Sequence, residues 1–455
     1  MQTLPVSSPR ARARRSAAAA VLATLAGLTT LATPAHAQEW PARPVRVIVP
    51  FAPGGSADVF GRYIAQRLQD SLGQTFVIDN RPGAGSLIGT DAVAKAAPDG
   101  YTLLVMSNTH TVNESLIPNR PYQLMRDFAP VAPINYSDLV LVAKPSLPAA
   151  TPKDLIALAK ARPGALSYAS SGPGTPYHMA GELFKALAGM YIVHIPYRGS
   201  AGARTDVLGG QVDLMFDAIP TMTEHVKTGK VKAIATTGQQ RSPILPDVPT
   251  LTESGVAGYE ATLWLGVLAP RGTPPAIVAR LNAEIAKITG NPEVRRAWAA
   301  QGSTAMTMGV EEFTRYLNAD IEKWAEDYCL RLLDLCAELG VKIVPMFWGV
   351  AFGWELATGY PWGFWKGGDY DLLEEGKERF VKKTGKLRTH ARKLGLYLAH
   401  EIHGGTAAMT ADDFNMLVQI CGNDKVLAVN ADPSHCWEGE DFETRFRKVG
   451  ARVMA

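Results

Sequence analysis

The sequence predicts an α/β protein whose first part forms two lobes around a cleft and whose last part is an incomplete β/α barrel. Between residue 44 and about residue 324, short apolar segments alternate with amphipathic helical segments, a pattern typical of mostly parallel sheets covered by helices. Two extended segments, 133–142 and 259–269, have the character of crossings between lobes. The composition then changes, because five of the nine Trp and all four Cys lie after Trp324.

The two crossings predict that one lobe is built from separated segments and that the other lobe is inserted between them. We expect the first lobe to comprise residues 38–142 and 259–324 and the second lobe residues 143–258. The barrel-like segment is expected over 325–455. No Gly/Ser or Pro linker marks its start, so helix is expected to run into helix there.

The first lobe begins with an alternation of strands and helices. A helix is expected from about residue 57 to residue 72, because Phe60, Ile64 and Leu68 repeat every four residues on one face. The apolar strand candidates around it are residues 45–51, 76–80 and 101–106.

The first 37 residues have the pattern of an export signal. Four arginines between Arg10 and Arg15 precede the apolar stretch 17–32, and Ala35-His36-Ala37 fits a signal peptidase. We expect cleavage after Ala37 and a periplasmic protein, and no later stretch is apolar and long enough to span a membrane. The net charge of +3 gives no reason to expect nucleic-acid binding.

A Gly-rich loop after the first strand is the most informative segment. Here a strand ends and a helix begins, so free N–H groups and a partial positive charge are presented to an anion such as a carboxylate. Ser56 either caps the helix or donates to the ligand. The predicted ligand-binding residues of this loop are Phe51, Ala52, Gly54, Gly55, Ser56 and Asp58.

A second loop of the same kind lies in the other lobe, so that the two loops could hold the two ends of a diacid. His178 lies at the start of the following helix, and either packing or capping explains it as well as a ligand contact does. The predicted ligand-binding residues here are Ser170, Ser171, Gly172, Thr175 and His178.

Three further residues at strand ends are candidates. Asn108 follows the strand 101–106. Arg198 is expected to bind a carboxylate or, alternatively, to form an ion pair with Asp217 or Asp213. Asp217 is a candidate for recognising an amino or amide group. No P-loop, zinc motif or Ser-His-Asp set stands out, and the Gly83-to-Gly89 segment departs from the dinucleotide-binding spacing.

Residues 41–324 resemble the Bug-type solute receptors of tripartite tricarboxylate transporters. The resemblance rests on Phe51 to Asp58, Asn80 to Gly85, Pro98 to Leu104, Ser170 to Glu182 and Pro196 to Gly199. It implies a two-lobed periplasmic binding protein of the type II clamshell class and a small carboxylate ligand held by backbone amides and waters. It also implies membrane transporter subunits as partners and no cofactor.

The last 131 residues again read as strand, helix and strand. Glu401 and His403 share one face of a strand, and Asp432 and His435 lie just past another strand end. Such positions carry catalytic or metal-binding groups in β/α barrels, although surface carboxylates explain them equally well.

The motifs His400 to His403 and Asp432 to His435 resemble a xylose-isomerase-like sugar phosphate isomerase/epimerase barrel. The resemblance implies that Glu401, Asp432 and His435 bind a divalent metal such as Mn²⁺ or Mg²⁺. About three of eight strands are present, so a complete metal site is not expected. We therefore predict a non-catalytic receptor for a small di- or tricarboxylate, an amino acid or a related acid. The alternatives are an isomerase-like enzyme and a non-functional chimera.

Overall fold

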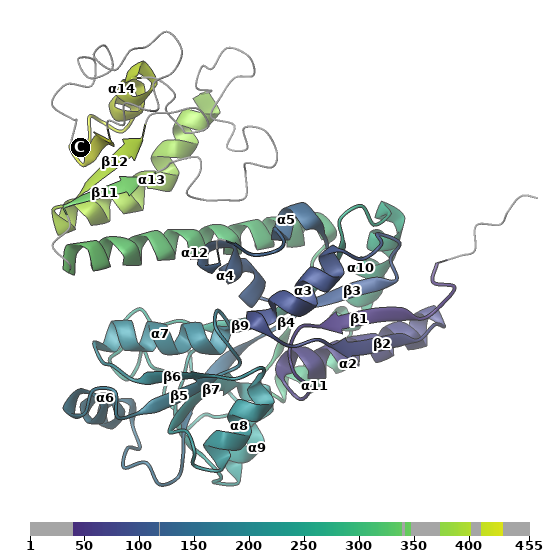
Figure 1. Cartoon of the computed structure of the whole chain (residues 1–455). Coiled ribbons are helices and arrows are strands. Elements are labelled where there is room, and N and C mark those ends of the chain that lie inside the picture. Colours follow the sequence, from purple (N-terminus) through teal and green to yellow (C-terminus); the bar gives the residue numbers. More distant parts are fainter. Residues whose placement is uncertain (1–39, 118, 339–341, 347–373, 402–410, 431–455) are drawn as a thin grey trace, which may run out of the picture. The chain divides into compact units, whose positions relative to one another are not determined.

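The computed structural model describes residues 40–117, 119–338, 342–346, 374–401 and 411–430 (Figure 1). None of the helices in this part of the chain is both long and apolar enough to cross a bilayer. Two groups of strands and helices form the receptor-like part, and a third group follows the long helix α12 (Val310–Glu338).

The first lobe is built on a sheet in the order β2-β1-β3-β9-β4. β1 runs parallel to β2 and β3, whereas β9 is antiparallel to β3 and β4. Their apolar side chains form a buried core that includes Ile48, Leu104 and Trp264. The strands are β1 (Val45–Val49), β2 (Phe76–Asn80), β3 (Thr102–Ser107), β4 (Phe128–Ala143), β9 (Thr262–Pro270) and the short β10 (Thr304–Ala305).

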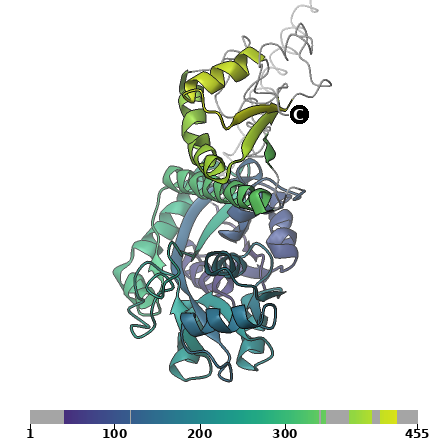
Figure 2. The ribbon, with the colours of Figure 1, turned by 90° about the vertical axis from the view of Figure 1, so that its left-hand side faces the viewer.

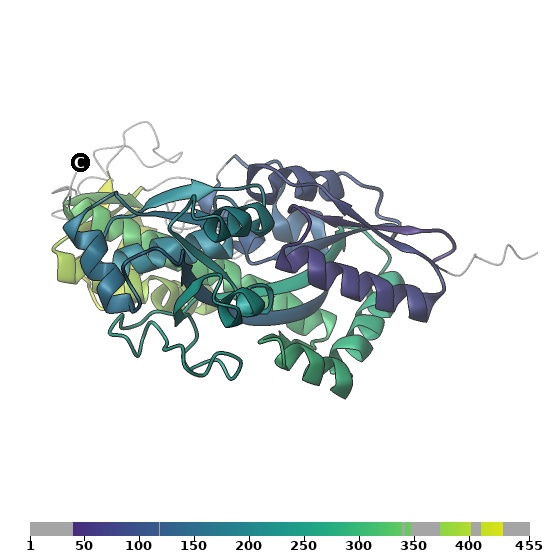
Figure 3. The same ribbon diagram turned by 90° about the horizontal axis from the view of Figure 1, so that it is seen from below.

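Helices cover both faces of this sheet, with α2 and α10 on one face and α3 on the other (Figure 3). The predicted apolar face of α2, with Phe60, Ile64 and Leu68, is buried as expected. The elements are α2 (Ser56–Leu72), η1 (Ala84–Ser86), α3 (Leu87–Ala94), α4 (Thr109–Leu116), α5 (Leu124–Asp127), α10 (Pro275–Gly290) and α11 (Pro292–Ala299).

The second lobe extends the sheet in the order β4-β7-β5-β6, and β8 pairs with the other edge of β4. Its core includes Val140, Met215 and Val207. The strands are β5 (Ser167–Ser170), β6 (Val193–Pro196), β7 (Leu214–Ala218) and β8 (Lys232–Thr236). The helices are α6 (Pro152–Ala161), α7 (Pro176–Ala188), α8 (Ser200–Leu208) and α9 (Ile219–Lys227).

The strand β4 belongs to both lobes. It pairs with β9 from Phe128 to Asp138 and with β7 and β8 from Leu139 to Ala143. The expectation of mostly parallel sheets is wrong, because four parallel pairs and five antiparallel pairs join the described strands β1 to β10. The antiparallel pairs arise because the chain crosses on β4 and returns on β9.

The helix α12 continues without a break through Trp324, as the sequence predicts. The following segment has three parallel strands in the order β11-β12-β13, with α13 packed against β12 and α14 (Figure 2). Arg388 and Arg392 of α13 both donate to Asp424. The elements are β11 (Ile343–Met346), α13 (Glu374–Leu394), β12 (Tyr397–Glu401), α14 (Ala411–Ile420) and β13 (Leu427–Asn430).

Candidate ligand-binding site

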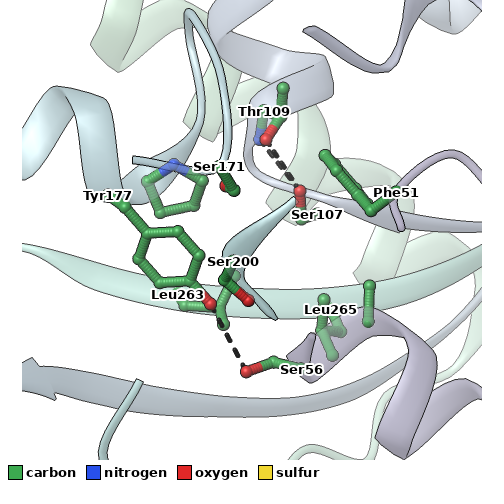
Figure 4. Close-up of a pocket in the computed structure, with 11 residues that line it drawn as sticks. Phe51, Ser56, Ser107, Thr109, Ser171, Tyr177, Ser200, Leu263 and Leu265 are labelled. Carbon is green, nitrogen blue, oxygen red and sulfur yellow. Dashed lines mark hydrogen bonds between the residues drawn. The ribbon is translucent and has the colours of Figure 1, made fainter. Parts of the chain in front are cut away.

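A small cavity lies where loops of the two lobes meet over β9 (Figure 4). It measures about 30 Å³, which is room for about two water molecules. A larger ligand therefore enters only if the lobes move apart. We call it the interlobe cavity. Its lining residues are Phe51, Ser56, Ala57, Ser107, Thr109, Ser171, Pro176, Tyr177, Ser200, Leu263 and Leu265.

Four helices begin at this cavity. Ser56 starts α2, Thr109 starts α4, Pro176 starts α7 and Ser200 starts α8, and all four residues line the cavity. The N–H groups of a first helical turn have no partner within the helix, and the helix dipole adds a partial positive charge. The cavity is therefore suited to an anion although none of its lining residues carries a charged side chain.

Hydroxyl groups supply the remaining polarity. The Ser56 hydroxyl of the first lobe lies 3.4 Å from the Tyr177 hydroxyl of the second, and the Ser107 hydroxyl donates to Thr109 Oγ1 at 2.9 Å. Figure 4 shows both pairs. Burial raises the pKa of Tyr177, so its hydroxyl stays protonated and can donate a hydrogen bond.

The two lobes approach each other at glycines. A Cβ atom on Gly199 would lie 2.7 Å from the Ala52 Cβ, and one on Gly55 would lie 2.9 Å from the Ser200 hydroxyl. Real Cβ atoms do not approach so closely, so a larger residue at Gly199 would hold the lobes apart.

Of the first predicted loop, Phe51 and Ser56 line the cavity. Ala52, Gly54 and Gly55 form the turn beneath them, and the N–H of Ala52 donates to the Arg198 carbonyl across the lobes. Asp58 is buried and accepts hydrogen bonds from Gly54, Arg62 and Asn80. Burial acts to raise the pKa of Asp58, but these hydrogen bonds together lower it, so the carboxylate fixes the turn.

Of the second predicted loop, Ser171 lines the cavity. The others hold the loop in shape: Ser170 Oγ accepts from the Gly172 N–H and contacts His194 Nε2 at 2.6 Å, and Thr175 Oγ1 donates to the Gly172 carbonyl. His178 Nδ1 accepts from the Gly174 N–H. The rings of His178 and His194 stack with 4.1 Å between their centroids.

The remaining predicted residues lie around the interlobe cavity. Arg198 is exposed and lines a neighbouring hollow of about 360 Å³, which also contains Phe51 and Ser171. The alternative prediction, that Arg198 forms an ion pair with Asp217 or Asp213, is wrong. Asp217 pairs with Arg204, and Asp213 pairs with Lys144.

Asp217 is fully buried in that pair, and burial raises its pKa. Asn108 is buried beside the interlobe cavity, and its Nδ2 donates to the Thr262 carbonyl.

Sequence reasoning missed several lining residues, which were not among the candidates. Ser107, Thr109 and Ser200 also stand where a strand is followed by a helix, so the signal that identified Ser56 was present for them. Tyr177 stands at the start of α7 and carried the same signal, whereas Leu263 and Leu265 on β9 had none, because only the meeting of the two lobes brings them to the cavity.

The predicted metal ligands cannot be examined together. Asp432 and His435 lie outside the described residues, and Glu401 is described only as the last residue of β12. In the part of the chain that the structure describes, no three His, Cys, Asp or Glu residues are grouped to hold a metal ion.

Residues 60–327 match the family model described as tripartite tricarboxylate transporter family receptor. The chain belongs to this receptor family. It is 41% identical over 308 residues to the protein BugT of Bordetella pertussis, covering 67% of this chain and 94% of that protein.

Two solved structures share the fold. The receptor part is similar to R. palustris Rpa4515, which was solved with adipate, at a TM-score of 0.61 and 36% identity, covering 63% of this chain and 96% of that one. It is also similar to MatC of Rhodopseudomonas palustris, which was solved with bound malate. The TM-score is 0.60 and the identity 32%, and the match covers 63% of this chain and 98% of that one. These similarities confirm the predicted two-lobed fold.

A second family model, described as xylose isomerase-like TIM barrel, matches residues 270–455. This match confirms that the C-terminal segment resembles a xylose-isomerase-like barrel. It begins inside the receptor match, earlier than residue 325, where the barrel-like segment was expected to start.

Proposed function

We propose that this receptor captures a small carboxylate in the periplasm and delivers it to the membrane subunits of a tripartite tricarboxylate transporter. The observation that carries the proposal is the convergence of four helix N-termini on one cavity between the lobes. Adipate and malate, the ligands of the two similar structures, are small dicarboxylic acids, which would enter this site only with the lobes further apart.

The chemistry of the lining favours a carboxylate over a cation or a sugar. Free N–H groups and hydroxyl donors suit an anion, whereas no acidic side chain lines the interlobe cavity to attract a cation. The apolar side chains of Phe51, Leu263 and Leu265 suit the hydrocarbon part of a dicarboxylic acid. The ligand-binding residues are therefore Phe51, Ser56 and Ser171 from the sequence candidates, together with the helix starts at Thr109 and Ser200.

Export and lobe boundaries belong to the same proposal. Cleavage after Ala37 would release a mature receptor that begins shortly before β1. The first lobe would comprise residues 38–142 and 259–324 and the second lobe residues 143–258, with the change of partner in β4 between Asp138 and Leu139 as the physical crossing. The receptor would need no cofactor and would catalyse no reaction.

Titration calorimetry against a panel of acids tests this function. The panel includes adipate, malate, a tricarboxylate and matched monocarboxylates, each with and without Mn²⁺. We expect at least one di- or tricarboxylate to bind, with no effect of the metal. At a ligand concentration 100-fold above Kd, such binding stabilises the native state by about 2.7 kcal/mol.

A pair of variants connects the binding to the interlobe cavity. Gly199→Ala is expected to weaken binding at least tenfold, because its Cβ would collide with Ala52 when the lobes close. Gly202→Ala is the control, since the nearest atom to its Cβ is 3.4 Å away. No binding by any acid, or equal binding by both variants, would contradict the proposal.

The C-terminal match supports a second candidate function, a metal-dependent isomerase-like site at Glu401, Asp432 and His435. Its three parallel strands are the kind of unit from which a β/α barrel is built. A response to Mn²⁺ alone in the same panel, lost in Glu401→Gln, would favour this function.

A further inference from the structure

A second cavity lies beside the segment on which the chain returns from the second lobe to the first. Its volume is about 230 Å³, and among its lining residues only Pro176 also lines the interlobe cavity. Its walls come from α7 of the second lobe, from α12 of the first lobe and from the returning segment between Glu260 and Trp264. We call it the hinge-side cavity.

The charged groups of the hinge-side cavity are two carboxylates and one ammonium group, from Asp320, Glu260 and Lys323. Asp320 Oδ2 accepts a hydrogen bond from the Thr111 hydroxyl, and no cation among the described residues lies within ion-pair distance of Asp320. Burial raises the pKa of Asp320, although hydrogen bonds from Thr111, Trp324 and Trp264 and the charge of Lys323 oppose this effect. A cation entering the cavity would therefore compensate a carboxylate that the protein itself leaves without a close ion pair.

One residue lining the same cavity also carries an unused hydrogen-bonding group. Asn108 is only 4% exposed, yet its Oδ1 has no hydrogen-bond partner among the described residues. The indole N–H groups of Trp264 and Trp324 act as donors toward Asp320. Buried polar groups are normally satisfied, so an acceptor oxygen without a donor suggests an occupant that donates a hydrogen bond, as an ammonium group does.

The aromatic side chains of the hinge-side cavity identify the occupant more closely. Trp264, Tyr316 and Trp324 line it, and the Lys323 ammonium lies 5.9 Å from the ring centroid of Trp324. An aromatic face together with a carboxylate is the combination that binds organic cations. A bare metal ion fits less well, because Mg²⁺ and Ca²⁺ require about six oxygen ligands in a compact shell.

We propose that the hinge-side cavity binds a small organic ammonium ion, with its charge at Asp320 and Glu260 and its carbon chain against the aromatic wall. This site is additional to the carboxylate site, and the proposal stands whichever acid binds there. Because its walls come from both lobes, an occupant contacts both. Ammonium and acid binding are therefore linked, each changing the affinity of the other by the same factor.

Titration calorimetry of the purified full chain with n-butylammonium chloride tests the proposal, with 1-butanol and sodium butyrate as neutral and anionic analogues. We expect butylammonium to bind and both analogues to bind at least tenfold more weakly. Asp320→Asn is expected to weaken butylammonium binding at least tenfold. Glu260→Gln should weaken it severalfold, and this exposed position keeps the test informative if the Asp320 variant does not fold.

Asp70→Asn, an exposed carboxylate on α2, is the control and should bind butylammonium as the unchanged chain does. The proposal is overturned if butylammonium does not bind, if 1-butanol or butyrate binds equally well, or if Glu260→Gln and Asp320→Asn leave its affinity unchanged.

Discussion

Single residues show how this receptor can bind an anion without a cationic side chain. Ser56, Thr109, Pro176 and Ser200 each start a helix at the interlobe cavity. Pro176 has no N–H and the Thr109 N–H donates to Ser107 Oγ, so in the proposed site the remaining N–H groups of these first turns would replace the arginines common in carboxylate sites. Such groups are held by the fold and do not lose side-chain entropy when the ligand binds.

Two stacked histidines hold the second ligand loop and make it sensitive to pH. Burial, with His178 nearby, lowers the pKa of His194 to about 4, and burial also lowers the pKa of His178. The groups around them are Glu182, which His178 approaches at 3.8 Å, and Lys185, which pairs with Glu182. Protonation of His178 at Nδ1 would remove the acceptor used by the Gly174 N–H.

We therefore expect acid to destabilise the receptor. The pKa of His194 in the folded chain lies below the unfolded value of about 6.5. Its contribution to the free energy of unfolding is therefore complete above pH 6.5. This contribution is lost as the pH falls toward 4, because the unfolded chain takes up the proton first. The free energy of unfolding should fall by about 1 kcal/mol between pH 7 and pH 5, a value reduced for partial exposure. Urea unfolding at several pH values measures this, and His194→Gln should flatten the dependence. An equal slope in that variant would show that other groups are responsible.

The sequence predicted only those cavity-lining residues whose local pattern indicates them. Phe51, Ser56 and Ser171 stand in Gly-rich loops between a strand and a helix, and the structure places all three at the cavity. The ion pairs were predicted less well, because Arg204 lies within α8 and reaches Asp217 only when α8 packs on β7. Arg198 was chosen because it stands at the end of a strand, although Arg204 is nearer to Asp217 in the sequence.

At the level of elements, the alternation of strands and helices predicted the strands and helices of the first lobe but not their directions. Periodicity reports burial and is the same for a parallel or an antiparallel partner. The pairing of β4 with β9 depends on residues more than 120 positions apart, such as Asp138 and Thr262. This pairing therefore forms only when both lobes are assembled, and the local sequence does not predict it.

The position of α8 depends on one buried ion pair. Arg204 donates to Asp217 Oδ2 at 2.8 Å, and Asp217 is fully buried on β7. Arg204→Met is expected to cost about 3–5 kcal/mol, since it leaves a buried carboxylate without its partner. Arg241→Met is the control, because Arg241 and Glu253 are both exposed and such pairs contribute less than about 1 kcal/mol. Chemical denaturation measures the free energy of unfolding of both variants. Similar losses in the two variants would mean that the buried pair has no special role.

In the whole molecule, the unbroken helix α12 joins the receptor part to the barrel-like segment. Its first half belongs to the receptor, because Phe313, Leu317 and Ile321 pack into the core of the first lobe. Beyond it, β11 and β13 each pair with β12 only, among the described strands, and strands paired on one side favour association between chains.

A chain that ends at Glu338 should therefore keep its acid affinity within about twofold, because every residue that lines the interlobe cavity lies between Phe51 and Leu265. It should also remain monomeric at higher concentration than the full chain, since β11 to β13 are absent. Calorimetry and light scattering of the two chains measure this. A chain that ends at Gly309 is the contrasting control, because it loses Phe313, Leu317 and Ile321 from the core and should not fold. A tenfold loss of acid affinity on ending at Glu338 would instead mean that the barrel-like segment takes part in binding, and the receptor could then not be treated as an independent unit.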